Sequence, residues 1–150
     1  MSGLWFEQFE VGQIFSHDIR KTVTESDNAL FCAMTYNPAA IHVDHHYCAS
    51  TEFGAPLVNS VFTLGLVVGL SVQDTTMGTT VANLGFSDIE FPAPVLVGDT
   101  IRAETEVIEL RASKSRPHQG IVKFEHRGLN HKGEVVCRAR RSALMLREHS

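Results

Sequence analysis

A short polar run early in the chain holds the side chains best suited to proton transfer. It reads Thr-Tyr-Asn-Pro-Ala-Ala-Ile-His-Val-Asp over residues 35–44, with Asn37 and His42 five positions apart. Histidine titrates near neutral pH, so His42 can give or take a proton, and the Asn37 amide can position a water or a carbonyl beside it. Pro38 predicts a loop over residues 36–41, where reactive groups are often presented. The alternative is that His42 is a surface or capping residue.

The apolar stretch at residues 58–72 is the element most able to position a substrate beside that run. Apolar residues occur on every side of its helical wheel, which predicts a helix enclosed by other elements. Gly65 and Gly69 share one face, where we expect a sheet to approach closely. Asn59 and Ser60 stand at the start, where unpaired N–H groups and the helix dipole favour an oxyanion. Ordinary helix capping would need the same two residues.

The remaining segments predict one α+β domain with a single buried helix. A strand is expected at residues 14–23, followed by a helix from Glu25 to Thr35 capped by Thr24. Asp44 is placed to cap a second short helix that ends near Glu52. Four extended stretches rich in β-branched residues come after the central helix, at residues 80–91, 99–110, 119–129 and 134–146. This order predicts an antiparallel sheet that curls around the helix.

The composition is that of one soluble globular domain. The chain has 150 residues, of which 43% are hydrophobic and 20% charged, and a formal charge of −4, so it lacks the basic footprint of nucleic-acid-binding proteins. No signal or anchor pattern is present at the N-terminus, and residues 58–72 are fewer than the roughly 20 that span a membrane, so we expect a cytoplasmic location. Cys32, Cys48 and Cys137 predict reduced, mostly buried thiols.

Three segments together resemble the MaoC-like hydratase/dehydratase family. They are residues 35–44, Phe-Gly-Ala-Pro-Leu-Val-Asn-Ser at 53–60 and Phe-Pro-Ala-Pro-Val-Leu-Val-Gly-Asp-Thr at 91–100, in the family's order. Within the family, the first segment and Val-Ala-Asn-Leu-Gly-Phe at 81–86 are similar to the β-methylmalyl-CoA dehydratases, also called mesaconyl-CoA hydratases. The resemblance implies the hot-dog fold, an antiparallel β-sheet wrapped around a long central helix. It also implies a hydro-lyase that adds or removes water across the Cα–Cβ bond of an acyl-CoA thioester, without a metal or cofactor.

The family motif, as in the (R)-specific enoyl-CoA hydratases, places an aspartate five residues before its histidine. That position is Asn37 here, and a gapped alignment would place Thr35 there instead, so neither alignment supplies a carboxylate. Because an amide cannot act as a general base, His42 would carry the proton transfer alone. Asp44 matches an acidic position of the family, although helix capping is its simpler role.

The same resemblance suggests how the thioester would be bound. Its oxygen would accept a hydrogen bond from the Ser60 backbone N–H, with Asn59 adjacent. Lys114 and Arg116, in the basic connection at residues 111–118, are candidates for binding the CoA phosphates, although solvated loop charges are the commoner explanation. His45 and His46 are adjacent and point in different directions, so we predict no metal.

Two other functions remain open at this point. A hot-dog acyl-CoA thioesterase would share the oxyanion site but would need a carboxylate or another means of activating a nucleophile. A non-catalytic acyl-CoA-binding subunit would account for the missing aspartate. Whichever function holds, the resemblance and the need of a sheet to protect its edges predict a homodimer or higher homo-oligomer in which each site is built from both chains. No nucleic-acid or membrane partner is expected.

Overall fold

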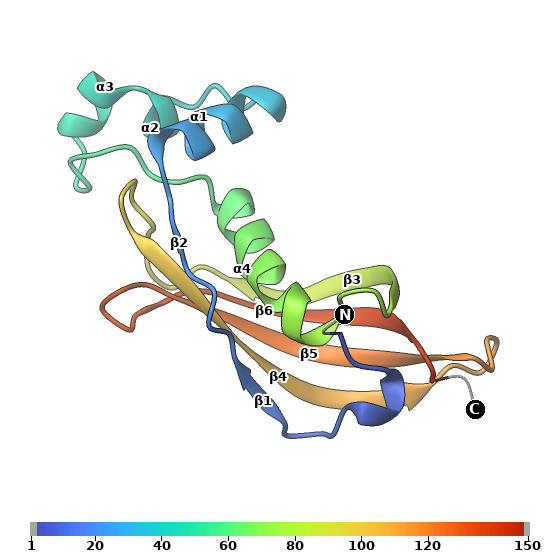
Figure 1. The fold of residues 1–150 in the computed structure, drawn as a ribbon. Coiled ribbons are helices and arrows are strands. Elements are labelled where there is room, and N and C mark those ends of the chain that lie inside the picture. The colour runs from blue at the N-terminus through green and yellow to red at the C-terminus, as the bar shows by residue number, and fades with distance from the viewer. Residues whose placement is uncertain (1–2, 149–150) are drawn as a thin grey trace.

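The computed structural model describes residues 3–148 and shows an antiparallel sheet wrapped around one long helix (Figure 1). The strands are β1 (Ile14–Ser16), β2 (Lys21–Thr22), β3 (Thr80–Glu90), β4 (Thr100–Ala112), β5 (Gln119–Leu129) and β6 (Val135–Leu146). The helices are η1 (Phe6–Gln8), α1 (Glu25–Met34), α2 (Ala40–Val43), α3 (His45–Ala49) and α4 (Ser60–Thr75). The sheet order is β1-β4-β5-β6-β3, and β2 also pairs with β4. The predicted α+β class and order of elements are therefore confirmed.

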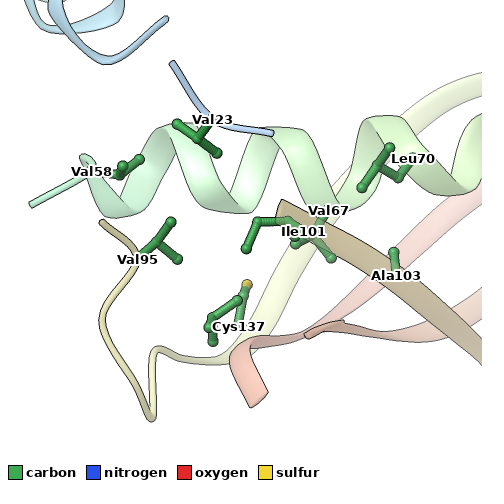
Figure 2. Close-up of a cluster of buried hydrophobic side chains, with 9 residues drawn as sticks. Val23, Val58, Val67, Leu70, Val95, Ile101, Ala103 and Cys137 are labelled. Carbon is green, nitrogen blue, oxygen red and sulfur yellow. The ribbon is translucent and has the colours of Figure 1, made fainter. Parts of the chain in front are cut away.

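The central helix α4 lies on the concave face of the sheet, where it packs against β4, β5 and β6. It begins at Ser60 and ends at Thr75, slightly later at both ends than the predicted range of 58–72. Figure 2 shows Val67 of α4 beside Ile101 of β4, and both side chains are fully buried. The apolar stretch thus supplies the core that holds the helix on the sheet.

The predicted close approach at Gly65 and Gly69 is wrong for this chain. A Cβ atom built on either glycine would have no atom within 4 Å, and both residues are exposed. The close contact between helix and sheet occurs instead at Gly128 of β5, where an added Cβ would collide with the Val67 side chain. The buried side of α4 is therefore the side that carries Val67, while the glycine side faces outward.

Two shorter elements also differ from the predictions. The strand expected at residues 14–23 is divided into β1 and β2, both of which pair with β4, and the buried His17 follows β1 with its backbone N–H donating to Ala103 O at 3.1 Å. The loop expected at residues 36–41 gives way at Ala40 to α2, so His42 lies on a helix. Thr24 caps α1 and Asp44 caps α3, as predicted, although α3 already ends at Ala49.

A line of buried polar side chains joins the last turn of α4 to three neighbouring strands. Arg141 of β6 donates its Nε–H to His126 Nε2 at 3.1 Å, and His126 Nδ1 lies 2.9 Å from Thr105 Oγ1. Thr105 Oγ1 lies 2.8 Å from His17 Nε2, and His17 Nδ1 lies 2.7 Å from Asp74 Oδ2. Because arginine can only donate, every hydrogen in this line points from Arg141 toward Asp74.

This polar line affects the ionisation of its buried members. Burial, with a smaller contribution from the nearby Arg141 and His17, lowers the pKa of His126 well below its ordinary value. Burial also lowers the pKa of Arg141 to about 10. His126 is therefore neutral in the folded protein at neutral pH, as its role as the acceptor from Arg141 requires.

The three cysteines are unpaired and buried, as predicted, and burial raises the pKa of Cys137 to about 11. A thiol with so high a pKa is not a nucleophile at neutral pH. Across residues 3–148, none of the helices combines the length and apolar character needed to cross a bilayer.

Candidate active site

A cavity of about 330 Å³ opens beside the N-terminal end of α4. Three of its lining side chains are polar, those of His42, Ser60 and Thr63. The others are hydrocarbon and come from Phe53, Leu57, Val58, Phe91, Pro92, Ala93, Pro94, Val95 and Val136. The cavity therefore joins the three segments at 35–44, 53–60 and 91–100, and its volume suits a small ligand.

The start of α4 presents a free backbone donor to this cavity. Asn59 is the N-cap: its Oδ1 accepts from Val61 N at 3.0 Å and its carbonyl oxygen accepts from Thr63 N at 3.1 Å. Within residues 3–148, the N–H of Ser60 has no acceptor. The donor and the positive end of the helix dipole thus coincide at Ser60, which is the arrangement that stabilises an oxyanion.

His42 lines the same cavity and is held in one orientation. Its Nδ1 lies 2.9 Å from the carbonyl oxygen of Leu57, which can only accept, so Nδ1 carries the hydrogen. In the neutral ring the lone pair is then on Nε2, which has no partner among the described residues. This tautomer can accept a proton at Nε2 and return it, as a general base and acid must.

Asn28 of α1 ties the parts of the site together. It is 1% exposed, and its Nδ2 donates to His42 O at 3.0 Å and to Leu57 O at 3.1 Å. Its Oδ1 accepts from Asn59 N at 2.9 Å. One side chain therefore positions the histidine segment, the segment that accepts from the histidine, and the start of α4.

The other predicted site residues do not converge on the cavity within one chain. Asn37 Oδ1 accepts from Ala39 N at 3.1 Å, and Asn37 is not part of the lining. The Asn59 side chain serves the cap and contacts Cys32 Sγ at 3.8 Å, so only Ser60 of that pair reaches the cavity. Lys114 and Arg116 lie in the connection between β4 and β5, at the other end of the sheet.

Asp44 serves as a helix cap, since its Oδ1 accepts from Tyr47 N at 3.0 Å. Among residues 3–148, histidine, cysteine, aspartate and glutamate side chains nowhere form a group of three that could hold a metal ion. The chemistry available in the cavity is therefore proton transfer at His42 and oxyanion binding at Ser60.

Sequence reasoning did not identify Asn28 or Thr63 as parts of the site. One feature of the sequence pointed to Asn28: its polar amide lies next to Ala29 and Leu30, which belong to the apolar face of the predicted helix. Its partners in the site, His42, Leu57 and Asn59, are 14 to 31 residues away, and spacing along one helix cannot reveal such contacts.

The fold and the cavity define a hot-dog protein. A conserved hypothetical protein from Mycobacterium tuberculosis with a double hot-dog fold matches 98% of this chain and 45% of its own, with a TM-score of 0.88 at 24% identity. The family model described as MaoC like domain matches residues 7–128. The chain belongs to this MaoC-like family, and the resemblance stated from the sequence is confirmed.

Two relatives support the assignment. The MaoC-like dehydratase from Rhodospirillum rubrum has a TM-score of 0.85 and 27% identity, covering 99% of this chain and 100% of its own. Mesaconyl-CoA hydratase from Cereibacter sphaeroides is 33% identical over 135 residues, which are 90% of this chain. The match covers 39% of that relative, so the chain spans about two fifths of its length.

Proposed function

We propose that this protein is a hydro-lyase that adds water to, or removes water from, the Cα–Cβ bond of an acyl-CoA thioester. One observation carries the proposal: His42, whose Nε2 is free among the described residues, and Ser60, whose backbone N–H is free there too, line the same apolar cavity. The hydratase and dehydratase names of the relatives support the same reaction class. The requirements of the reaction are an oxyanion site and a proton carrier, and the cavity offers one of each.

In the hydration direction, His42 Nε2 takes a proton from water as the oxygen bonds to Cβ. The electrons of the double bond move toward the thioester, whose oxygen gains negative charge and accepts from the Ser60 N–H. The protonated His42 then gives its proton to Cα, and the carbonyl returns. The hydrocarbon walls lower the polarity around the thioester, which strengthens the hydrogen bond to the developing anion. No metal or cofactor is required for these steps.

The acyl group is the finer part of the proposal. Mesaconyl-CoA and β-methylmalyl-CoA are candidates from the names of two relatives, a mesaconyl-CoA hydratase and a β-methylmalyl-CoA dehydratase. Each carries a second carboxylate, which would need a cation. Hydrocarbon walls favour an uncharged acyl group instead, because a buried carboxylate without a partner is costly.

A homodimer in the cytoplasm belongs to the same proposal. β3 forms one edge of the sheet and every residue in it is exposed, including Leu84, Phe86 and Ile89. The outward side of α4, with Gly65 and Gly69, is uncovered as well. A second copy pairing along β3 would cover both surfaces and bring its own residues toward the cavity.

The test is hydration of crotonyl-CoA, longer enoyl-CoA thioesters and mesaconyl-CoA, followed by the ultraviolet absorbance of the enoyl thioester. His42→Ala should lower kcat/KM about 10²–10⁴-fold, the usual contribution of a general acid–base. His46→Ala is the matched control, because His46 is exposed on α3 and lies outside the cavity. Near-normal activity of His42→Ala, with its fold verified by circular dichroism, would exclude this mechanism.

Asn37 separates this proposal from a non-catalytic acyl-CoA-binding subunit. If Asn37 only orients water or substrate, Asn37→Ala should cost less than His42→Ala, and the pH profile of kcat/KM should show one histidine ionisation. Tight binding of acyl-CoA without turnover of any enoyl thioester would favour the binding subunit. Release of free CoA from a saturated acyl-CoA would favour a thioesterase.

A further inference from the structure

A second pocket, at the end of the sheet where β4 begins, gathers positive charge. Its volume is about 600 Å³, and we call it the cationic pocket. Arg20 comes from the link between β1 and β2, Arg102 from β4, and Lys132 from the turn between β5 and β6. The other lining residues are Thr100, Asn130, His131 and Gly133. Three cations from separate segments thus meet in one place.

Their charges are only partly balanced by the protein. Arg102 pairs with Glu104 at 3.1 Å, whereas the side chains of Arg20 and Lys132 have no ion-pair partner within residues 3–148. Glu134 stands beside the pocket and its carboxylate accepts from Asn130 Nδ2 at 3.2 Å. Arg20 and Lys132 are exposed, so solvent screens their repulsion, but an uncompensated positive charge at a pocket still attracts an anion.

The turn that carries Lys132 is fixed by hydrogen bonds. Asn130 is buried, and its Oδ1 accepts from the backbone N–H groups of both Lys132 and Glu134 at 3.0 Å. Gly133 has a φ of 78°, a conformation that favours glycine. On the facing segments, the hydroxyls of Thr22 and Thr100 lie 2.7 Å apart. The backbone of the pocket is therefore formed before any ligand arrives.

The cationic pocket lies near the candidate active site. Gly133 of the pocket and Val136 of the cavity are three residues apart, so their Cα atoms are at most about 11 Å apart. By contrast, Lys114 and Arg116 follow the last residue of β4, a strand of 13 residues whose length is roughly 40 Å. Figure 1 shows the β4–β5 and β5–β6 connections at opposite ends of the sheet.

We propose that the cationic pocket binds phosphate groups, those of the CoA part of the substrate, a proposal that rests on the proposed function. Phosphate oxygens accept from arginine in pairs and attract lysine as a point charge. The pantetheine arm would then run past the end of the strands from the pocket to the cavity. The sequence placed this role at Lys114 and Arg116, and within one chain the geometry favours Arg20, Arg102 and Lys132.

The experiment compares crotonyl-CoA with crotonyl-pantetheine, which has the same reacting group but lacks the phosphates. Lys132→Glu should raise KM for crotonyl-CoA about tenfold or more, and should leave KM for crotonyl-pantetheine and kcat for both nearly unchanged. Lys123→Glu, which reverses the same charge on β5 outside the pocket, should leave both KM values unchanged. Equal effects of Lys132→Glu on the two thioesters, or a rise in KM for crotonyl-CoA with Lys114→Glu alone, would overturn the proposal.

The source of the phosphate is decided by competition and by direct binding. The adenosine bisphosphate part of CoA should inhibit hydration of crotonyl-CoA at concentrations at which inorganic phosphate does not. Equal inhibition by the two would show a site for small anions and overturn the assignment to CoA. If the wild-type protein hydrates neither thioester, the proposed function fails. Calorimetry with adenosine bisphosphate then tests the phosphate site independently of activity. Binding to the wild type that is lost in Lys132→Glu supports the proposal, and no binding to the wild type overturns it.

Discussion

Replacing Asn28 by aspartate tests whether one buried amide positions the candidate site. Asn28→Asp keeps the shape of the side chain and the Oδ1 that accepts from Asn59 N. It removes the NH₂ group that donates to His42 O and Leu57 O. The substitution therefore separates the donating role of the amide from its packing.

The size of the effect follows from what happens to the two carbonyls. His42 O loses its donor, and a buried acceptor left unpaired costs about 1–3 kcal/mol. Leu57 O loses less, because the ring of His42 also donates to it at 2.9 Å. With the cost of burying the new carboxyl group, the free energy of unfolding should fall by about 2–4 kcal/mol. For a chain of this size, that corresponds to a Tm about 5–15 °C lower.

The assay is urea unfolding at pH 7, together with kcat/KM measured well below the Tm of the variant. Activity should fall along with stability, because both carbonyls belong to segments that line the cavity. At pH 5 the loss of stability should be smaller, since a protonated carboxyl group regains one donor. Ser26→Asp is the control, because it adds the same charge to an exposed position of α1. Unfolding of Asn28→Asp within about 0.5 kcal/mol of the wild type would refute this reasoning.

Three further outcomes are expected. Folded His126 stays neutral while the unfolded chain binds a proton below about pH 6.5, so the free energy of unfolding should fall by up to about 1.4 kcal/mol per pH unit under that value. Urea titrations from pH 7.5 to 5 should show this dependence of the free energy of unfolding on pH. In His126→Gln the dependence should be weaker, because the unfolded chain binds one proton fewer. Light scattering should give a dimer for the wild type and a monomer for Leu84→Arg, and a wild-type protein that is fully active as a monomer would count against pairing along β3. Crotonyl-CoA should be hydrated with a higher kcat/KM than mesaconyl-CoA, and the reverse ranking would mean that a cation reaches the acyl pocket.

The sequence predicted those features that local patterns determine. The long apolar stretch indicated α4, the β-branched stretches indicated β3 to β6, and Thr24 and Asp44 were identified as caps. The candidate residues His42 and Ser60 were found from the motif and do share a cavity. The helix, the strands and the caps depend on neighbours within a few positions, which is the range that periodicity and capping rules cover, whereas the pairing of His42 with Ser60 came from the family resemblance.

Features that depend on distant contacts were missed or misjudged. Gly65 and Gly69 were correctly placed on the helix, but periodicity cannot tell which side of an all-apolar helix meets the sheet. The structure shows that the side carrying Val67 packs against Gly128 of β5. The cationic pocket draws Arg20 and Lys132 together from positions more than a hundred residues apart, so charge clusters along the chain pointed to Lys114 and Arg116 instead.

The buried polar line from Arg141 to Asp74 has a mechanical consequence for α4. Asp74 lies in the last turn of the helix, where the dipole disfavours a negative charge, and its bond to His17 connects it to the positive charge on β6. At the other end, Asn28 holds the backbone of Asn59. The helix is thus clamped at both ends and cannot slide along the sheet without breaking charged or buried bonds. The backbone N–H of Ser60 is therefore held at a fixed position relative to His42, whether or not a substrate is present.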